Sequence, residues 1–594
     1  MSGFTLINVG AAANDGNGDS LRVSQQAVNS NYTSTPRSLS TVADLATEAA
    51  ASGYTRIVAD LTRGGVFKAV NGGAANGITI FASATAGWTW QRQYQCDIMA
   101  SWAGVVGDGI TDNYAAIASI VTAFPNGAVI NFGNDDTDVF GVSQGIEITG
   151  DSYTLIGTGT IKALSSYDET TEAGIIHLNG AESCHILIGT DGNRAENTGT
   201  PASGFVGNNV MMNDCYNCHA ATSTHKNSVY HAIAMVGATS HCSAKYNKIT
   251  TCGLNALLLH WRIDDTKLVT DCEVVGNDID GTMILDQAGA SIWLAATKRC
   301  KVERNNISGG GKRGIVLYCG DVGPNIRDNE VLFNTVDGAE DEAIYLDGQS
   351  STTSTVYGCS YNVFLGNTFK GSLSTPNGVL RYCEHNTFTG DVFDGGAGNG
   401  IDLQIESNRN TFTGVRVDRS ANVGWRVSGG SQNDFIGCSA EENASTGLTF
   451  TSSASYNKWI GGRLGDEFSG APVQAKPFEI AAGCAGNMVA FAQMFYNTTD
   501  NYTDNGTNSI IMLNQRSTTT ELEMTGAKLL TELVGNNLIS INASGGPKLL
   551  SGTGSPEGVT TAPVGSVYVN VSGGASATFY VKESGTGNTG WIAK

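Results

Sequence analysis

The sequence predicts an all-β chain whose central part is a parallel β-helix, a solenoid of stacked coils. Two observations lead to this prediction. An asparagine followed two places later by an apolar residue recurs along the chain, most often at intervals of about 24 residues. Upstream of these asparagines lie short stretches in which apolar and polar residues alternate, a pattern typical of strands. Because one such unit cannot bury its apolar face alone, successive units are expected to stack.

The composition supports a large folded protein with many tight turns. The chain has 594 residues, of which 41% are hydrophobic, enough for a sizeable core. It contains 76 glycines but only 10 prolines, which indicates turns and not proline-rich linkers. The formal net charge of -21 argues against nucleic acid or an anionic membrane surface as a partner, since both require clustered lysine and arginine.

The N-terminal part is predicted to contain two small regions. Residues 1–35 are polar and weakly helical near 20–32, and residues 36–95 alternate as in a small β-rich neck. The N-terminus lacks the basic and apolar stretches of a signal peptide, so we expect synthesis in the cytosol and reduced thiols for the 13 cysteines. No run of about 18 apolar residues predicts a membrane-spanning helix.

The β-helix is predicted over residues 96–490, with a short helix at about 112–123 that caps its start. The recurrent asparagines are expected at turns, because asparagine tolerates left-handed backbone and can hydrogen-bond to a stacked neighbour. These positions are Asn247, Asn277, Asn305, Asn329, Asn367, Asn386, Asn410, Asn433, Asn457 and Asn487. A β-sandwich with asparagine-rich turns is the alternative, which the repeat length disfavours.

Alternation within each strand predicts which side chains face the core. The expected inward pairs are Leu257 and Leu259, Ile292 and Leu294, Ile315 and Leu317, Ile344 and Leu346, Ile401 and Leu403, Trp425 and Val427, and Leu448 and Phe450. Cys319, Cys383 and Ile405 share the next inward column, so these cysteines are expected to be small core residues. Arg381 breaks the pattern, which means either that its strand is shifted by one residue or that Arg381 is paired inside.

The outward positions predict a polysaccharide site. Aromatic faces stack on sugar rings, while carboxylates and amides bind hydroxyl groups. The predicted substrate-binding residues in these outward columns are His260, Arg262, Trp293, Tyr318, Tyr345, Tyr382 and Gln404. No metal and no cofactor is expected, and CYNCH (215–219), with His225 and His231 nearby, is not expected to hold haem or zinc.

Four acids in these columns are the predicted catalytic residues: Asp347, Glu384, Asp402 and Glu406. Glu384 and Glu406 each lie six places after the glycine of the similar segments NGVLRYCEHN and NGIDLQIESNRN, so they are expected to stack on neighbouring coils about 4.8 Å apart. When two carboxyl groups stand this close together, the pKa of one of them rises, which provides a protonated acid beside a charged base. Asp347 would stand two coils, about 9.6 Å, from Asp402 or Glu406. The shorter separation suits a retaining glycosidase, and the longer separation suits an inverting one. The alternative interpretation is that these acids are solvated turn residues with no catalytic role.

Longer connections flank the strand that carries Asp347. Insertions on a solenoid often build a binding pocket, which makes the acids of the preceding loop further candidates. These are Asp337, Glu340, Asp341 and Glu342. Beyond about residue 490 the repeat fades into a β-rich region over 491–550, and residues 551–594 predict a small β tip.

Three segments resemble known families. GVVGDGITDNYAAI (104–117) resembles the opening signature of the pectate-lyase-like β-helix superfamily, with Asp112 matching and Asn113 replacing a second aspartate. The segment at 8–32 resembles virion-attachment segments of tailed-phage fibres and spikes, and YVKESGTGNTGWIAK (580–594) resembles their C-terminal tips.

The resemblance implies a right-handed β-helix in a bacteriophage tailspike. Such a protein is a homotrimer of the virion, with residues 1–35 attached to the tail or baseplate and 491–550 as a trimerisation region. It would depolymerise capsular or O-antigen polysaccharide, by endoglycosidic hydrolysis or alternatively by β-elimination in a lyase that uses histidine, arginine and tyrosine. A purely adhesive spike and a site between subunits are further alternatives.

Overall fold

The computed structural model describes residues 37–198, 206–260, 267–283, 289–309, 311–319, 325–348, 358–466, 473–494, 497–498, 502–512, 537–540 and 546–594. Within these ranges nearly all regular structure is β, and the predicted parallel β-helix is confirmed. The predicted attachment segment 1–35 and the predicted binding residue Arg262 lie outside the described residues. The chain divides into two compact units between Ala339 and Glu340.

The first unit begins with a five-stranded sheet in the order β1-β2-β3-β5-β4. Phe67 and Trp90 are fully buried at its centre, and the Arg92 guanidinium lies 4.6 Å from the centre of the Phe67 ring. Its elements are β1 Arg37–Leu39, the 3-10 helix η1 Val42–Thr47, β2 Thr55–Val58, β3 Gly65–Asn71, β4 Ile80–Ala82 and β5 Trp88–Arg92.

A short segment that contains the helix α2 precedes the coils. It contains β6 Asp97–Met99, η2 Ala100–Ala103, β7 Asp108–Asp112, α2 Tyr114–Ala123, β8 Val129–Asn131 and β9 Val139–Val142. The buried Asn113 side chain accepts a hydrogen bond from Val106 N (2.8 Å) and donates one to Val106 O (2.9 Å). The amide at this position therefore holds the glycine-rich loop in front of α2, with both a donor and an acceptor that a carboxylate would not supply together.

The coils of the first unit present three faces, which are called face 1, face 2 and face 3. Face 1 consists of β10 Ile146–Ile148, β12 Gly174–Asn179, β14 Asn208–Asn213, β17 His231–Val236, β20 Asn255–His260, β24 Ala290–Ala295 and β28 Arg313–Tyr318. The long strands β11 Thr154–Ala163 and β13 His185–Asp191 run through faces 2 and 3. Face 2 continues with β15 His219–Ala221, β18 Ser243–Lys245, β22 Glu273–Val275, β26 Lys301–Glu303 and β30 Glu330–Leu332. Face 3 continues with β16 Thr224–Lys226, β19 Lys248–Cys252, β23 Asp278–Met283, β27 Asn306–Ser308 and β31 Thr335–Asp337, and β21 Val269–Thr270, β25 Thr297–Lys298 and β29 Ile326–Arg327 lie at a corner.

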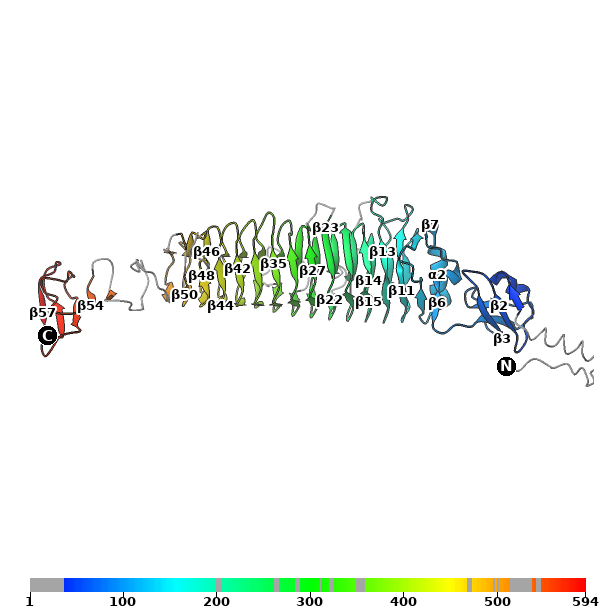
Figure 1. Cartoon of the computed structure of the whole chain (residues 1–594), viewed down its shortest axis with the longest axis horizontal. Coiled ribbons are helices and arrows are strands. Elements are labelled where there is room, and N and C mark those ends of the chain that lie inside the picture. Colours follow the sequence, from blue (N-terminus) through cyan, green and yellow to red (C-terminus); the bar gives the residue numbers. More distant parts are fainter. Residues whose placement is uncertain are drawn as a thin grey trace, which may run out of the picture. The chain divides into compact units, whose positions relative to one another are not determined.

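The coils of the second unit also present three faces, which are named in the same way, and Figure 1 shows the strands of this unit stacked coil after coil. Face 1 consists of β32 Ile344–Asp347, β36 Gly378–Arg381, β40 Ile401–Gln404, β43 Trp425–Ser428, β46 Thr446–Thr451, β49 Lys476–Ile480 and β51 Thr503–Asp504. Face 2 consists of β34 Val363–Leu365, β38 Thr387–Thr389, β41 Thr411–Thr413, β44 Asp434–Ile436, β47 Lys458–Ile460, β50 Met488–Ala490 and β52 Ile510–Met512. Face 3 consists of β35 Thr368–Lys370, β39 Val392–Asp394, β42 Arg416–Asp418, β45 Ser439–Glu441 and β48 Arg463–Leu464, with β33 Cys359–Ser360 and β37 Cys383–Glu384 at a corner.

Side chains stack inside each unit in continuous columns. Every predicted inward pair of face 1 is fully buried. In the second unit, the interior of face 2 is an aromatic stack of Phe364, Phe388, Phe412, Phe435 and Trp459, with ring centres 4.2 to 5.7 Å apart. Cys319 and Cys383 are buried as predicted, but Ile405 is 45% exposed, and the prediction that it faces inward is wrong.

Buried asparagine ladders close the turns. In the second unit one ladder is formed by Asn362, Asn386, Asn410, Asn433, Asn457 and Asn487. From Asn386 onward, each side-chain oxygen accepts hydrogen bonds from the backbone N–H and the side-chain amide of the asparagine one coil earlier. In the first unit Asn247, Asn277, Asn305 and Asn334 form another. The predicted hydrogen bonding between stacked asparagines is therefore confirmed. Asn329 and Asn367 belong to other corners, which explains why their spacing departs from about 24.

The last part of the second unit is a separate five-stranded sheet. It contains β53 Asn537–Ser540, β54 Lys548–Gly552, β55 Val567–Asn570, β56 Phe579–Lys582 and β57 Trp591–Ala593. Tyr568, Tyr580 and Trp591 form its small core. Among the described residues, no helix reaches the length and hydropathy that a membrane span requires.

Candidate functional site

The register of face 1 in the second unit brings several predicted site residues together. Asp347, Arg381 and Gln404 occupy one row across β32, β36 and β40. Tyr345, Val379, Asp402 and Arg426 occupy the neighbouring row across β32, β36, β40 and β43. The predicted neighbours Asp347 and Gln404 are thus in one row, but Arg381 stands where Tyr382 was expected.

The strand β36 is shifted by one residue, which was one of the two alternatives for Arg381. Leu380 faces the core and is fully buried, so Gly378 takes the other inward position. A side chain at Gly378 would meet the Phe393 ring, because a Cβ there would lie 2.7 Å from Phe393 Cε1. The aromatic ring therefore fills the space that an aliphatic side chain fills in the other coils, and Arg381 points outward.

Asp347 lies at the centre of a hydrogen-bonded cluster. The Tyr345 hydroxyl donates to Asp347 Oδ2 at 2.7 Å, and Arg381 Nη1 donates to the Tyr345 oxygen at 3.1 Å. Arg381 Nη1 also lies 3.5 Å from Asp347 Oδ2, and the Asp347 side chain is only 3% exposed whereas that of Arg381 is 29% exposed. Burial, together with the charge of Asp347, raises the pKa of Tyr345 well above its usual value, so this phenol stays protonated.

Asp402 forms a second cluster of the same kind. Arg426 Nε donates to Asp402 Oδ1 at 2.8 Å, Arg426 Nη2 pairs with Oδ2, and Gln404 Nε2 donates to Oδ2 at 2.9 Å. The Asp402 side chain is fully buried beneath these partners, and its hydrogen bond raises the pKa of Arg426. The groups that reach the surface here are thus a guanidinium and an amide, both oriented by Asp402.

The predicted stack of Glu384 on Glu406 is wrong. Glu384 pairs with Asn408 of the next coil, because the offset between coils is 23 residues at Arg381–Gln404 and 24 at Glu384–Asn408. Ile405 is the extra residue at this corner. Glu384 instead lies 3.4 Å from Arg409 Nη1, while Glu406 is exposed with left-handed backbone (φ 53°).

Tyr382 and the loop acids lie apart from these clusters. Tyr382 also has left-handed backbone (φ 51°), and its N–H donates to Ile405 O at 3.0 Å. Asp341 accepts a hydrogen bond from Ser374 Oγ at 2.9 Å. Asp337, predicted as a loop acid, instead ends β31 on face 3 of the first unit, whereas Tyr382 lies at a corner and Asp341 in a connection. None of these side chains belongs to the rows of face 1.

The predicted residues of the first unit form an aromatic cluster on face 1. His260, Ala295 and Tyr318 share a row, as predicted. The rings of Trp293 and Tyr318 meet edge to face at 5.7 Å. Trp293 packs against a buried apolar group of Met211, Ala234, Val236 and Leu258.

A row of three acids on face 3 of the second unit was not predicted. Asp394, Asp418 and Glu441 lie side by side on β39, β42 and β45. Burial, with a smaller contribution from the charge of Glu441, raises the pKa of Asp418 to about 6 against the opposing effect of Arg416. Asp394 and Glu441 are paired with Arg419 and Arg463. The signal in the sequence is an acid at the end of three successive strands, VFD, RVD and SAE.

Among the described residues, no group of three or more histidine, cysteine, aspartate or glutamate side chains is arranged to hold a metal ion. His225, near CYNCH, is completely buried, which lowers its pKa to about 4. Cys184, Cys218, Cys242, Cys272 and Cys300 occupy one buried corner of successive coils. These thiols pack in the turns as the asparagines do.

Comparison with known proteins supports the handedness of the fold. A family described as "Right handed beta helix region" matches residues 334–460. The tailspike protein of E. coli bacteriophage HK620, solved with a pentasaccharide, is 13% identical and aligns with a TM-score of 0.50 over 73% of this chain and 82% of that one. Tailspike protein 3 of bacteriophage CBA120 is also 13% identical, with a TM-score of 0.43 over 84% of this chain and 68% of that one.

An enzyme is also among the similar structures. The A-module of the Azotobacter vinelandii mannuronan C-5 epimerase AlgE6 is 11% identical, with a TM-score of 0.39 over 70% of this chain and all of that one. No curated protein sequence matches the chain significantly. The family match and the likeness to the HK620 tailspike show the fold alone, a right-handed β-helix.

Proposed function

We propose that this chain is a phage tailspike that binds and depolymerises an acidic polysaccharide of the bacterial surface, a capsule or an O-antigen. A tailspike of the same fold has been solved with a bound pentasaccharide, which supports a saccharide ligand. The proposed assembly is a homotrimer in the virion, attached to the tail through residues 1–35. The observation that carries the proposal is the pair of Asp–Arg clusters on face 1 of the second unit.

Both clusters present a cation to solvent and keep its counter-ion below the surface. The Arg381 and Arg426 side chains are 29% and 39% exposed, whereas Asp347 and Asp402 are 3% and 0% exposed. On a chain with a net charge of -21, two oriented guanidinium groups beside Gln404 form a local site for carboxylate groups. A sugar chain that carries acidic groups matches this arrangement better than a neutral one.

Endoglycosidic hydrolysis is the proposed reaction. Asp347 and Asp402 stand on strands that are two apart, about 9.6 Å, and in neighbouring rows, about 6.6 Å along the strand, so their backbones are about 12 Å apart. The carboxyl groups of inverting glycosidases are about 6.5–9.5 Å apart, so the two side chains must turn toward each other to act on one bond. One carboxylic acid would protonate the leaving oxygen while the other carboxylate activates water. The arginines must move from the carboxylates toward the substrate in this scheme, which exposes both acids. Glu384 and Glu406 take no part in it.

The contact between Arg381 and Tyr345 favours β-elimination as a second candidate reaction. In a lyase an arginine neutralises the uronate carboxylate while a tyrosine transfers a proton. Arg381 Nη1 donates to the Tyr345 hydroxyl at 3.1 Å, so the two groups are already adjacent. The products differ, because elimination leaves an unsaturated sugar that absorbs ultraviolet light, and hydrolysis does not.

The function is tested by incubating the protein with capsules and O-antigens from a strain panel. Product size is measured by mass spectrometry, and ultraviolet absorbance is followed during digestion. Shorter products without new absorbance are expected, and growth of absorbance would replace hydrolysis with elimination. A protein that binds a polysaccharide but shortens none would be an adhesive spike, and the proposed cleavage would be wrong.

The site is tested with two variants, each of which replaces an aspartate paired with an arginine by asparagine. Asp347→Asn is expected to lower the cleavage rate by about 10²–10⁴-fold, since it removes a catalytic carboxyl group. Asp394→Asn breaks a comparable Asp–Arg pair on face 3 and should leave the rate within about twofold of the wild type. The assignment to face 1 is wrong if Asp347→Asn stays active, and Asp418→Asn would then test the acid row of face 3.

A further inference from the structure

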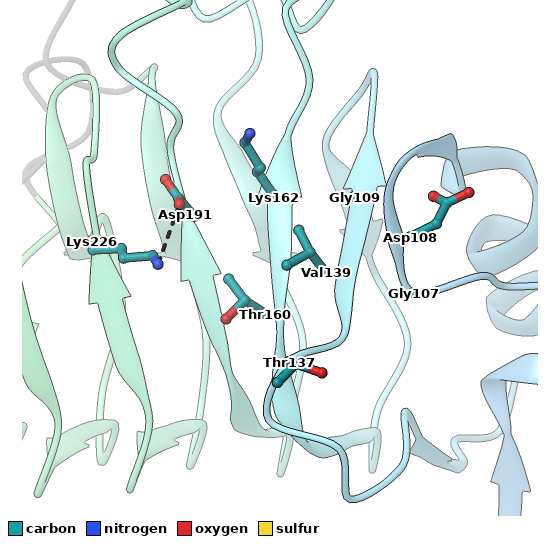
Figure 2. Close-up of a pocket in the computed structure, with 9 residues that line it drawn as sticks. All are labelled: Gly107, Asp108, Gly109, Thr137, Val139, Thr160, Lys162, Asp191 and Lys226. Atoms are coloured by element: carbon teal, nitrogen blue, oxygen red, sulfur yellow. Dashed lines mark ion pairs between the residues drawn. The ribbon is translucent and has the colours of Figure 1, made fainter.

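A cavity in the first unit lies on face 3, away from the strands that carry the predicted site residues. Its volume is about 280 Å³. The lining residues come from β7, β9 and the loops before them, and from the strands β11, β13 and β16 (Figure 2); they are Gly107, Asp108, Gly109, Thr137, Val139, Thr160, Lys162, Asp191 and Lys226. The volume is near the lower end for small-molecule pockets, which gives room for about one sugar ring.

Both acids of this cavity are already occupied by protein donors. Asp108 accepts hydrogen bonds from Ile110 N, Thr111 N and Thr111 Oγ1, and the hydrogen bonds with Thr111 lower its pKa, so it stays charged. Asp191 accepts hydrogen bonds from Asn193 N at 2.8 Å and Asn227 Nδ2 at 3.0 Å. These acids therefore shape the cavity wall and are not the groups that would bind a ligand.

The two lysines of the cavity differ in their partners. Lys226 Nζ lies 3.5 Å from Asp191 Oδ2, as the dashed line in Figure 2 marks. Lys162 is also beside Asp191 in the register of β11 and β13, yet within the described part of the chain its ammonium group makes no hydrogen bond or ion pair. Figure 2 shows its amino group apart from the Asp191–Lys226 pair. Lys162 is thus a cation in a concave site with the capacity to donate to a ligand.

We propose that this cavity binds one carboxylated sugar unit, as a second saccharide site separate from face 1 of the second unit. Lys162 pairs with the sugar carboxylate, and the Thr160 hydroxyl binds a sugar hydroxyl. The Thr137 hydroxyl donates to Asp135 Oδ1 at 2.7 Å, so it can only accept a hydrogen bond from the sugar. The ligand class rests on the proposed function, but the inference requires binding only and no cleavage. A second site would let the chain hold a polymer at two places and so increase its effective affinity.

The test follows the reactivity of individual lysines in the full chain. The protein is treated with an amine-acetylating reagent in the presence of glucuronate, glucose or inorganic phosphate, and acetylation is located by peptide mass spectrometry. Glucuronate is expected to slow acetylation of Lys162 at least about fivefold, while glucose leaves the rate unchanged. Lys248, an exposed lysine of β19 outside the cavity, is the internal control and should react equally in all three samples.

Two results would overturn the inference. The first is an unchanged acetylation rate of Lys162 with glucuronate, and the second is equal protection by phosphate, which would mean that the site selects charge and not a sugar. The isosteric variant Thr160→Val should lose at least half of the protection, since it removes a hydroxyl group but not the lysine; full protection would contradict the sugar contacts. Protection of Lys162 in a protein that cleaves nothing would refute the proposed cleavage alone.

Discussion

The side chains that define face 1 of the second unit are aspartates held by arginines. Sequence patterns identify Asp347 and Asp402 as outward acids, because they alternate with buried leucine and isoleucine. They do not reveal that each acid is covered by a guanidinium, since Arg381 and Arg426 come from other coils. The consequence is that each arginine depends on its aspartate for orientation, and each buried aspartate depends on its arginine for stability.

The variant Arg426→Gln should therefore destabilise the fold. It leaves the fully buried Asp402 carboxylate with Gln404 as the remaining donor of the cluster, and a buried group deprived of a partner costs about 1–3 kcal/mol. The midpoint of urea unfolding measures the loss. Arg409→Gln breaks the exposed pair with Glu384 and should cost no more than about 1 kcal/mol. Equal losses in both variants would contradict the special role given to the buried pair.

At the scale of the element, the asparagine ladder is the main device that fixes the turns. Asn410 N and Nδ2 donate to Asn433 Oδ1 at 2.9 and 3.1 Å, Nδ2 also donates to Cys383 O at 3.0 Å, and its own oxygen accepts from Asn386. Asn410→Ala leaves several of these buried groups without partners and should lower the free energy of unfolding by about 2–4 kcal/mol. Urea unfolding checks this. Thr413→Ala, at an exposed position of β41, is the control and should change stability little; a similar loss there would contradict the ladder's importance.

A second ladder contains an acid in place of an amide. Asn367 N and Nδ2 both donate to Asp391 Oδ1 at 2.8 Å, whereas Oδ2 is buried and has no hydrogen-bond partner among the described residues. Burial raises the pKa of Asp391 from 3.8 to about 7. Between these two values the folded protein retains a proton that the unfolded chain has released, so the free energy of unfolding falls as the pH rises through this window.

The variant Asp391→Asn removes this pH dependence. Its amide stays neutral and can donate where Oδ2 cannot, so it should be more stable than the wild type at pH 8 and about equal to it near pH 4. Thermal midpoints of both proteins across this range give the measurement. A stability difference that does not grow with pH would show that Asp391 does not retain its proton in the fold.

The sequence predicts which side of each strand faces the core, but it does not predict how one coil aligns with the next. Alternation of apolar residues reports the side that faces the core, and the inward pairs of face 1 are correct for that reason. The alignment of one coil on the next depends on single residues at corners, such as Ile405 and Gly378, and the apolar pattern contains no signal for them. This is why the row of Asp347 and Gln404 is correct while the stack of Glu384 on Glu406 is wrong.

At the scale of the whole molecule, the outer surface of face 2 in the second unit bears on the proposed trimer. Its outward side chains are mostly aliphatic or threonine, namely Val363, Leu365, Thr387, Thr389, Thr411, Thr413, Ile436, Ile460, Met488 and Ile510. The charged exceptions among these strands are Asp434 and Lys458, which pair at 3.4 Å. A sheet of short, uncharged side chains is suited to packing against another copy of the chain, and faces 1 and 3 are far richer in charge.

We therefore expect the protein to have about three times its chain mass of 61.9 kDa by light scattering, and we expect face 2 to form the contact. Ile436→Glu places a charge on this surface, where the side chain is 42% exposed in the single chain, so the fold tolerates it but an interface does not. The variant should lower the measured mass while far-ultraviolet circular dichroism stays unchanged. Leu373→Glu alters a more exposed apolar residue outside the strands of face 2 and should remain trimeric. A monomeric wild type would contradict the trimer, whereas a trimeric Ile436→Glu variant would move the interface away from face 2 and leave that surface free.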